Sequence, residues 1–113
     1  MEIKENEFIR TKTGKIDKVI NNNYYMSQYI ECEKRIVEKE NIVKHSFNII
    51  DLIEVGDFVN ENEVIDKYLF NGEIPVLETT GDETNAKCMC EGDIKTILTH
   101  EQYERNCYRL EDN

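Results

Sequence analysis

Four cysteines and two histidines are the side chains of this sequence with the chemistry to ligate a metal or to act as nucleophile or base. The cysteines are Cys32, Cys88, Cys90 and Cys107, and His100 is a further potential ligand. A closed zinc site usually takes two ligand pairs, each with two to four residues between its members, whereas Cys88 and Cys90 are separated by one residue and have no second pair. We therefore predict reduced thiols and no metal site.

His45 and His100 are the candidate bases for catalysis. A nucleophilic mechanism needs a nucleophile and an orienting carboxylate within reach of the base. Ser46 follows His45, but no Gly-x-Ser-x-Gly turn accompanies it, and the five glycines form no phosphate-binding loop. We predict that the protein is not an enzyme, has no catalytic residue and takes no cofactor.

The carboxylates carry more information, because they are concentrated in one segment of a chain with a formal charge of −10. Residues 1–50 hold nine basic and eight acidic side chains, residues 51–93 hold two and twelve, and residues 94–113 hold three and four. A segment of this charge repels phosphates, so the sequence argues against direct binding of nucleic acid. The acidic pairs in it lack the register of a calcium loop.

Some of these carboxylates have the spacing of neighbours on one face of a strand. Residues two apart on a strand lie roughly 6.8 Å apart, and Glu61 and Glu63 have this spacing, with Asp57 expected further along the same side. Such a row can imitate a nucleic-acid backbone and occupy a groove lined by Lys and Arg, with binding that weakens in salt. The alternative is an acidic surface that only keeps the protein soluble. The predicted partner-binding residues are Asp57, Glu61, Glu63, Asp66, Asp82 and Glu83.

The elements that carry these side chains are predicted to be short strands joined by tight turns. Gly14 and the Asn71-Gly72 pair supply the left-handed backbone of hairpin turns, and the run Asn21–Asn23 is a further turn signal. Pro75 cannot donate to a strand ladder, so its strand is expected at a sheet edge. Residues 80–91 are expected to form a loop.

Two short helical turns are also expected. Ser46 can cap a turn over Phe47–Ile53, and Thr99 with Gln102 fits a capping box that would leave His100 solvated in the following turn. Residues Cys107–Leu110 are expected to close the fold as a strand.

These patterns predict a mainly β, β-rich α+β protein: a small antiparallel barrel or sandwich with one or two short helical turns. A chain of 113 residues suits one domain, residues 1–113. No apolar run approaches the roughly 20 residues that cross a bilayer, and the charged segment Met1–Glu7 is unlike a signal peptide. We therefore expect a cytoplasmic location with reduced thiols and no membrane partner. Self-association through edge strands stays open.

Three stretches resemble a family of small uncharacterised proteins from phages and prophages of Firmicutes: Phe8–Ile16, Val43–Asn60 and Ile94–Glu104. The block from Lys44 to Asn60 is the most specific of them. The family pattern continues after Val59 with Asn-Gly, whereas Glu61 follows Asn60 here, which reshapes that turn. No activity is assigned to the family, so the resemblance supplies no catalytic residue.

The resemblance implies a phage setting, where small acidic proteins often bind host or defence proteins. Our first hypothesis is therefore an anti-CRISPR-like inhibitor that docks its acidic segment on a basic, nucleic-acid-binding surface of a host or defence protein. A second is a small-molecule or nucleotide-signal sponge with Arg10, Lys12, Lys44 and His45 as anion contacts, which needs a preformed pocket. A third is a phage accessory protein with a structural or interaction role.

Overall fold

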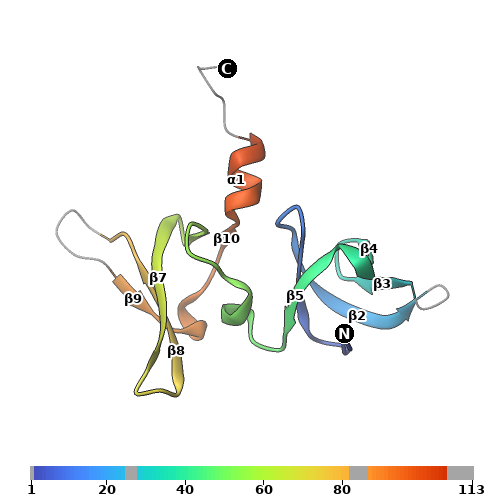
Figure 1. The fold of residues 1–113 in the computed structure, drawn as a ribbon, viewed down its shortest axis with the longest axis horizontal. Helices are drawn as coiled ribbons and strands as arrows, with labels where there is room; N and C mark the ends of the chain where they lie inside the picture. Colours follow the sequence, from blue (N-terminus) through green and yellow to red (C-terminus); the bar gives the residue numbers. More distant parts are fainter. Residues whose placement is uncertain (1, 25–27, 82–86, 107–113) are drawn as a thin grey trace.

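The computed structural model describes residues 2–24, 28–81 and 87–106, which form two five-stranded antiparallel sheets lying side by side (Figure 1). The strand order is β4-β3-β2-β1-β5 in the N-terminal sheet and β10-β6-β7-β8-β9 in the C-terminal sheet. The molecule is flat, with principal extents of 52 × 45 × 20 Å. The predicted fold class, mainly β with short helical turns, is confirmed. None of the described helices is long and apolar enough to cross a membrane.

The N-terminal sheet is built from residues 8–46. Its elements are β1 (Phe8–Thr11), β2 (Ile16–Tyr24), β3 (Tyr29–Cys32), β4 (Ile36–Glu38), the 3-10 turn η1 (Lys39–Asn41) and β5 (Ile42–Ser46). Gly14 makes the β1–β2 turn with φ +85°, as predicted. The predicted turn at Asn21–Asn23 is wrong, because these residues lie within β2, where shifts in the β2–β3 register accommodate them. The core consists of Ile3, Ile9, Val19, Ile30, Cys32, Val37 and Ile42.

The C-terminal sheet follows the 3-10 turn η2 (Ile49–Leu52). Its elements are β6 (Phe58–Val59), β7 (Asn62–Phe70), β8 (Ile74–Thr79), β9 (Lys87–Met89), the 3-10 turn η3 (Glu91–Asp93), β10 (Ile97–Leu98) and helix α1 (His100–Asn106). Its core is a second cluster: Ile50, Ile53, Val59, Val64, Leu77 and Met89. Each sheet therefore buries its own apolar residues. The single-domain organisation stays a prediction.

Two sequence expectations about the C-terminal sheet were wrong and one was right. The Asn71-Gly72 turn joins β7 to β8 with φ values of +54° and +74°, as a tight hairpin requires. Pro75, however, lies on an inner strand. Its missing N–H is tolerated because, within the described residues, β9 pairs only with Leu77–Thr79 and leaves that side of Pro75 without a neighbouring strand. Strand β9 also forms inside the segment that was expected to be a loop.

Helix α1 begins at the junction of the two sheets (Figure 1). The predicted capping box is present: the Gln102 backbone N–H donates to Thr99 Oγ1 at 3.3 Å, and the Thr99 backbone N–H donates to Gln102 Oε1 at 3.2 Å. Thr99 Oγ1 also donates to the Gly14 carbonyl at 2.8 Å. The start of α1 is thereby fixed against the β1–β2 turn. The predicted strand Cys107–Leu110 lies outside the described residues.

Candidate functional site

The predicted acidic row is only partly available to a partner. Asp57 is completely buried, with 0% of its surface exposed, and it forms an ion pair with Arg10. Its prediction as a partner-binding residue is wrong, because it faces the interior and is already neutralised by that guanidinium. Asp82 and Glu83 lie outside the described residues.

Glu61, Glu63 and Asp66 are exposed, but they do not form one evenly spaced row. Glu61 lies in the turn between β6 and β7, where it and Asn60 both have positive φ, +73° and +52°. Glu63 and Asp66 lie on β7, which bulges between Val64 and Asp66 as it pairs with β8. The bulge inserts Ile65, so the spacing of the two carboxylates differs from that of an unbroken strand.

Alternation along β7 and β8 divides the C-terminal sheet into a buried and a solvent-exposed face. Val64, Leu77 and Thr79 are each 0% exposed, so they point into the core. Their neighbours must point to the opposite side. We call this side the outer face; its exposed or half-exposed residues are Glu63, Ile65, Asp66, Tyr68, Phe70, Ile74, Glu78 and Cys88, and Val76 on the same side is buried.

The acidic part of the outer face contains like charges in direct opposition. Asp66 on β7 is the register partner of Glu78 on β8, and like charges in such a position destabilise a sheet. Among the described residues no Lys, Arg or His forms an ion pair with Glu63, Asp66 or Glu78. The carboxylates therefore stay uncompensated within the described chain.

The other part of the outer face is apolar and aromatic. Tyr68, Phe70 and Ile74 are 39%, 52% and 48% exposed on the β7–β8 hairpin, which extends beyond the rest of its sheet (Figure 1). The Tyr68 hydroxyl lies 3.6 Å from Cys88 Sγ. The hydrogen bond to Cys88, followed by desolvation and the negative charges of Glu78 and Asp66, raises the pKa of Tyr68. Tyr68 therefore lies where the apolar and acidic parts meet.

Sequence reasoning missed these apolar residues, although a signal was present. Tyr68-Leu69-Phe70 is a run of three large apolar residues directly before the Asn71-Gly72 turn signal. Because strand side chains alternate, such a run places apolar groups on both faces of the hairpin. One of those faces cannot belong to the core, and Leu69, on the opposite side, is also 58% exposed.

A second polar cluster is buried where the two sheets meet. The Arg10 guanidinium on β1 is 0% exposed and donates two hydrogen bonds to Asp57, at 2.5 and 2.9 Å. It also donates to Glu101 of α1 at 2.5 Å and to the Leu52 carbonyl at 2.9 Å. A single side chain from the N-terminal sheet thus binds three segments of the C-terminal half.

Asp57 extends this cluster through the backbone. Its carboxylate accepts the backbone N–H of Glu54 at 2.7 Å and that of His100 at 2.9 Å. A buried carboxylate with one bidentate Arg partner and two N–H donors has its hydrogen-bonding capacity largely satisfied. Asp57 is therefore a structural residue that joins β1, the η2–β6 connection and the start of α1.

His100 lies at the edge of this cluster and is not simply solvated, as was expected. Its Nε2 lies 2.9 Å from Glu54 Oε1, and Lys44 Nζ lies 3.1 Å from Glu54 Oε2. Burial opposes ionisation of Glu54, but the hydrogen bonds from His100 and Lys44, together with the charge of Arg10, outweigh it and lower the pKa of Glu54. The hydrogen bond to Glu54 raises the pKa of His100 against the opposing effect of burial.

Glu54, His100 and Glu101 hold ligand atoms within 4.8 Å of one another, close enough to share a metal ion. The Arg10 guanidinium already occupies this cluster, with Nη2 2.5 Å from Glu101 Oε1 and 3.7 Å from Glu54 Oε1. A divalent cation would therefore be placed against a buried positive charge. Within the described chain neither histidine is hydrogen-bonded to a hydroxyl or a thiol. The cluster has the composition of an ion-pair network.

The anion contacts of the small-molecule hypothesis are mostly engaged elsewhere. Arg10 is buried among carboxylates, Lys44 is paired with Glu54, and His45 Nδ1 lies 2.9 Å from Glu7 Oε1. Lys12 is the exception, because it lines a surface hollow. The residue set expected for that hypothesis is therefore not assembled, although one of its members is available.

Comparison with known proteins supplies no functional information for this site. No family model matches the chain, and no significant match is found among curated proteins or solved structures. The resemblance to phage proteins stays a prediction.

Proposed function

We propose that the protein is a non-enzymatic binding protein that docks its outer face on a protein partner carrying both basic and apolar side chains. The observation that carries this proposal is the combination on one sheet face of carboxylates without an ion pair in the described chain (Glu63, Asp66, Glu78) and exposed apolar side chains (Tyr68, Phe70, Ile74). Interfaces typically contain such an aromatic centre with a polar rim.

The alternative, that the acidic surface only keeps the protein soluble, explains the outer face less well. Charges that only keep a protein in solution need no particular arrangement and no aromatic neighbours. Here two carboxylates oppose each other across the strand pair, and the adjacent apolar side chains are left in water. Both features are unfavourable in the free protein, and both would be relieved by a partner that supplies cations and apolar contacts.

The charge of the face favours a different protein over a second copy of this chain. In a two-fold dimer each patch meets itself, and the outer face contains no Lys or Arg, so a second copy would bring no opposite charge to Glu63, Asp66 and Glu78. A partner surface lined by Lys and Arg removes this repulsion. Surfaces of that kind commonly bind phosphates, so an inhibitor of a nucleic-acid-binding host or defence protein is the specific form of the proposal, as the phage resemblance implies.

The test captures partners from the lysate of a Firmicutes host with the wild-type protein and with matched double variants. Tyr68→Ser/Phe70→Ser removes the apolar part of the outer face, and Glu63→Lys/Asp66→Lys reverses its charge. The apolar control is Ile20→Ser/Val43→Ser, since these two residues are 49% and 48% exposed on the N-terminal sheet. The charge control is Glu5→Lys/Glu33→Lys, at two exposed carboxylates of the N-terminal half.

We expect a protein that wild type and both controls retain and that both outer-face variants lose, with retention that falls as salt increases. The purified partner should then reproduce these differences in calorimetric titrations. Equal capture by all five proteins would contradict the proposal. Sedimentation analysis of the chain alone tests whether a second copy covers the outer face. If the wild type is a dimer and only Tyr68→Ser/Phe70→Ser abolishes it, the partner is a second copy of this chain and not a basic protein.

A further inference from the structure

A surface hollow of about 470 Å³ lies on the N-terminal sheet, between the β1–β2 hairpin and β4. Its volume falls within the range of sites for small molecules. The residues that matter to its chemistry are Lys12, Thr13, Lys15, Tyr29, Arg35 and Ile36. The hollow lies on the N-terminal sheet, whereas the outer face lies on the C-terminal sheet, so the two are separate sites.

The charge of this hollow is opposite to that of the protein as a whole. Three cations line it, Lys12, Lys15 and Arg35, against one carboxylate, Glu38. Within the described chain neither lysine forms an ion pair. Arg35 Nη1 lies 3.5 Å from Asp17 Oδ2 and is the only one of the three cations that is partly neutralised there. In a chain of net charge −10 this concentration of positive charge favours an anion.

The backbone around these cations is fixed before any ligand binds. The Lys12 N–H donates to the Asn41 carbonyl at 2.8 Å, and the Lys15 N–H donates to Thr11 Oγ1 at 3.1 Å. Between them, the Gly14 carbonyl accepts the hydrogen bond from Thr99 at the start of α1. Because hydrogen bonds to Asn41 and Thr99 already hold the hairpin, less conformational entropy is lost when a ligand binds.

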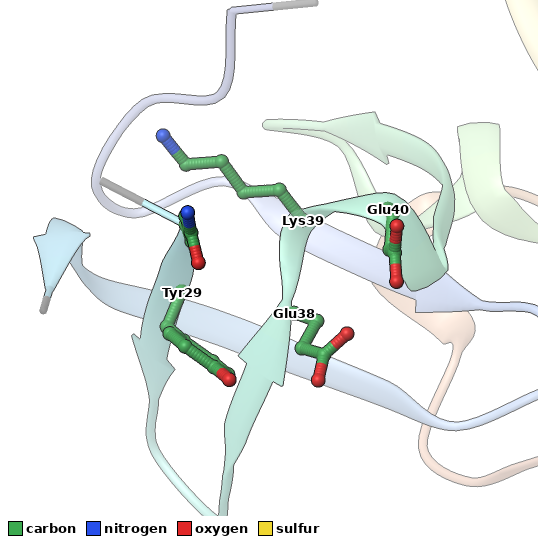
Figure 2. Close-up of a pocket in the computed structure, with 5 residues that line it drawn as sticks. Tyr29, Glu38, Lys39 and Glu40 are labelled. Atoms are coloured by element: carbon green, nitrogen blue, oxygen red, sulfur yellow. The ribbon is translucent and has the colours of Figure 1, made fainter. Parts of the chain in front are cut away.

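The hollow also offers an apolar wall. Ile36 is 54% exposed and Tyr29 lines the hollow beside it. Figure 2 shows the neighbouring hollow, of about 530 Å³, where the side chains of Tyr29 and Glu38 project in the same direction from adjacent strands. That second hollow contains Glu38 and Glu40 against Lys39. Its balance of charge is acidic, so an anion belongs in the first.

We infer that the hollow beside the β1–β2 hairpin binds a phosphate-bearing small molecule of mononucleotide size. The phosphate lies among Lys12, Lys15 and Arg35, where cations and the Thr13 hydroxyl can contact it. The ring of the ligand packs on Ile36 and Tyr29. Because this site shares no residue with the outer face, loss of docking by the outer-face variants would leave it intact.

The experiment titrates isotope-labelled protein with AMP, adenosine and inorganic phosphate, and follows backbone amide shifts by NMR together with calorimetry. We expect saturable AMP shifts in residues 11–15 and 35–38, with weaker binding of phosphate and none of adenosine. Lys12→Glu/Lys15→Glu should reduce AMP affinity by at least about tenfold. Lys4→Glu/Lys95→Glu, at two exposed lysines outside the hollow, should leave it unchanged.

A further variant distinguishes the contribution of the phosphate from that of the ring. Ile36→Ser should weaken AMP and leave phosphate binding unchanged, and a dispersed spectrum of each variant shows that it is folded. Three results would overturn the inference: no saturable shift with AMP, equal binding of AMP and adenosine, or an equal loss of affinity in the Lys4→Glu/Lys95→Glu control.

Discussion

The two sheets treat their carboxylates differently. In the N-terminal sheet the buried carboxylates Glu7 and Asp17 are 6% and 5% exposed and serve the fold. Glu7 binds the Lys4 N–H and His45, and Asp17 binds the Lys34 N–H and Arg35. In the C-terminal sheet the outer-face carboxylates Glu63 and Asp66 are exposed and Glu78 is half-exposed, and none of them has an ion pair within the described chain. The first pair of carboxylates stabilises the fold, whereas the opposed pair Asp66 and Glu78 has no such partner within the described chain.

The exposed apolar side chains differ less between the two sheets than the carboxylates do. Both sheets expose single aliphatic residues, which is normal for a small protein. Only on the β7–β8 hairpin, within the described residues, do exposed aromatic and aliphatic side chains lie beside opposed carboxylates. The buried cluster around Arg10 connects the two sheets, and we call it the joint. We therefore expect the largest effects from changes at the joint and the smallest from changes on the outer face.

The largest effect is expected from removing the cation at the joint. Arg10→Met leaves Asp57 buried without its partner, and the loss of one member of such a pair costs about 3–5 kcal/mol of unfolding free energy. Chemical denaturation measures this. Arg35→Met, at a half-exposed arginine paired with Asp17, should cost less than about 1 kcal/mol. Similar losses for the two variants would mean that Arg10 does not join the sheets.

A smaller effect is expected at the β1–β2 turn. Gly14 has φ +85°, and an added Cβ would lie 2.2 Å from Thr99 Oγ1, so Gly14→Ala must displace the start of α1. Gly72 has φ +74° with nothing within 4 Å, so Gly72→Ala has only the backbone cost. We expect Gly14→Ala to cost about 1–3 kcal/mol more than Gly72→Ala. Equal unfolding free energies for the two variants would refute close docking of the turn on α1.

The joint should also respond to pH through His100, which faces Glu54, Glu101, Asp57 and Arg10. A pKa raised by folding above its ordinary value of 6.5 gives stability that is complete below that value and is lost as the pH rises through the folded-state pKa. Because His100 is partly exposed, we expect less than about 1 kcal/mol.

The measurement is the difference in unfolding free energy between wild type and His100→Gln, which should be larger at pH 5.5 than at pH 9. The same comparison in a Glu54→Gln background provides the control, since His100 then lacks its main partner. A pH-dependent difference of equal size in that background would assign the effect to other groups.

The smallest effect is expected on the outer face, and it has the opposite sign. Asp66→Asn removes a like-charge neighbour of Glu78, so it should stabilise the free protein by about 0.2–1 kcal/mol at low salt. The gain should diminish as salt screens the repulsion. Glu5→Gln, at an exposed carboxylate of the N-terminal half, serves as control. A destabilised Asp66→Asn protein would show that this carboxylate serves the fold.

Local signals in the sequence predicted much of the fold. Gly14, Asn71-Gly72 and the Thr99 capping box act within a few residues, so their turns and helix start can be derived from neighbours alone. The Asn21–Asn23 turn failed because pairing with β3 overrode the local preference of asparagine. The prediction that Pro75 lies on an edge strand failed because the end of β9, later in the chain, decides which part of β8 has a free side.

The site was predicted less well, for the same physical reason. Asp57 was expected on the surface, but its partner Arg10 lies 47 residues away and no local pattern reveals that pairing. Glu63 was identified from charge and its strand spacing to Glu61, and Asp66 from charge; both are exposed. Glu78 and the hairpin aromatics were missed because cross-strand register decides which side chains meet.

The proposed docking through the outer face is tested most directly by the affinity of the purified partner for two charge-reversed proteins. Calorimetry at low salt should show at least about tenfold weaker binding for Glu63→Lys/Asp66→Lys than for wild type. Glu5→Lys/Glu33→Lys should bind as wild type does. Equal affinities for the two reversed proteins, or a stronger loss for the N-terminal pair, would contradict docking through the outer face.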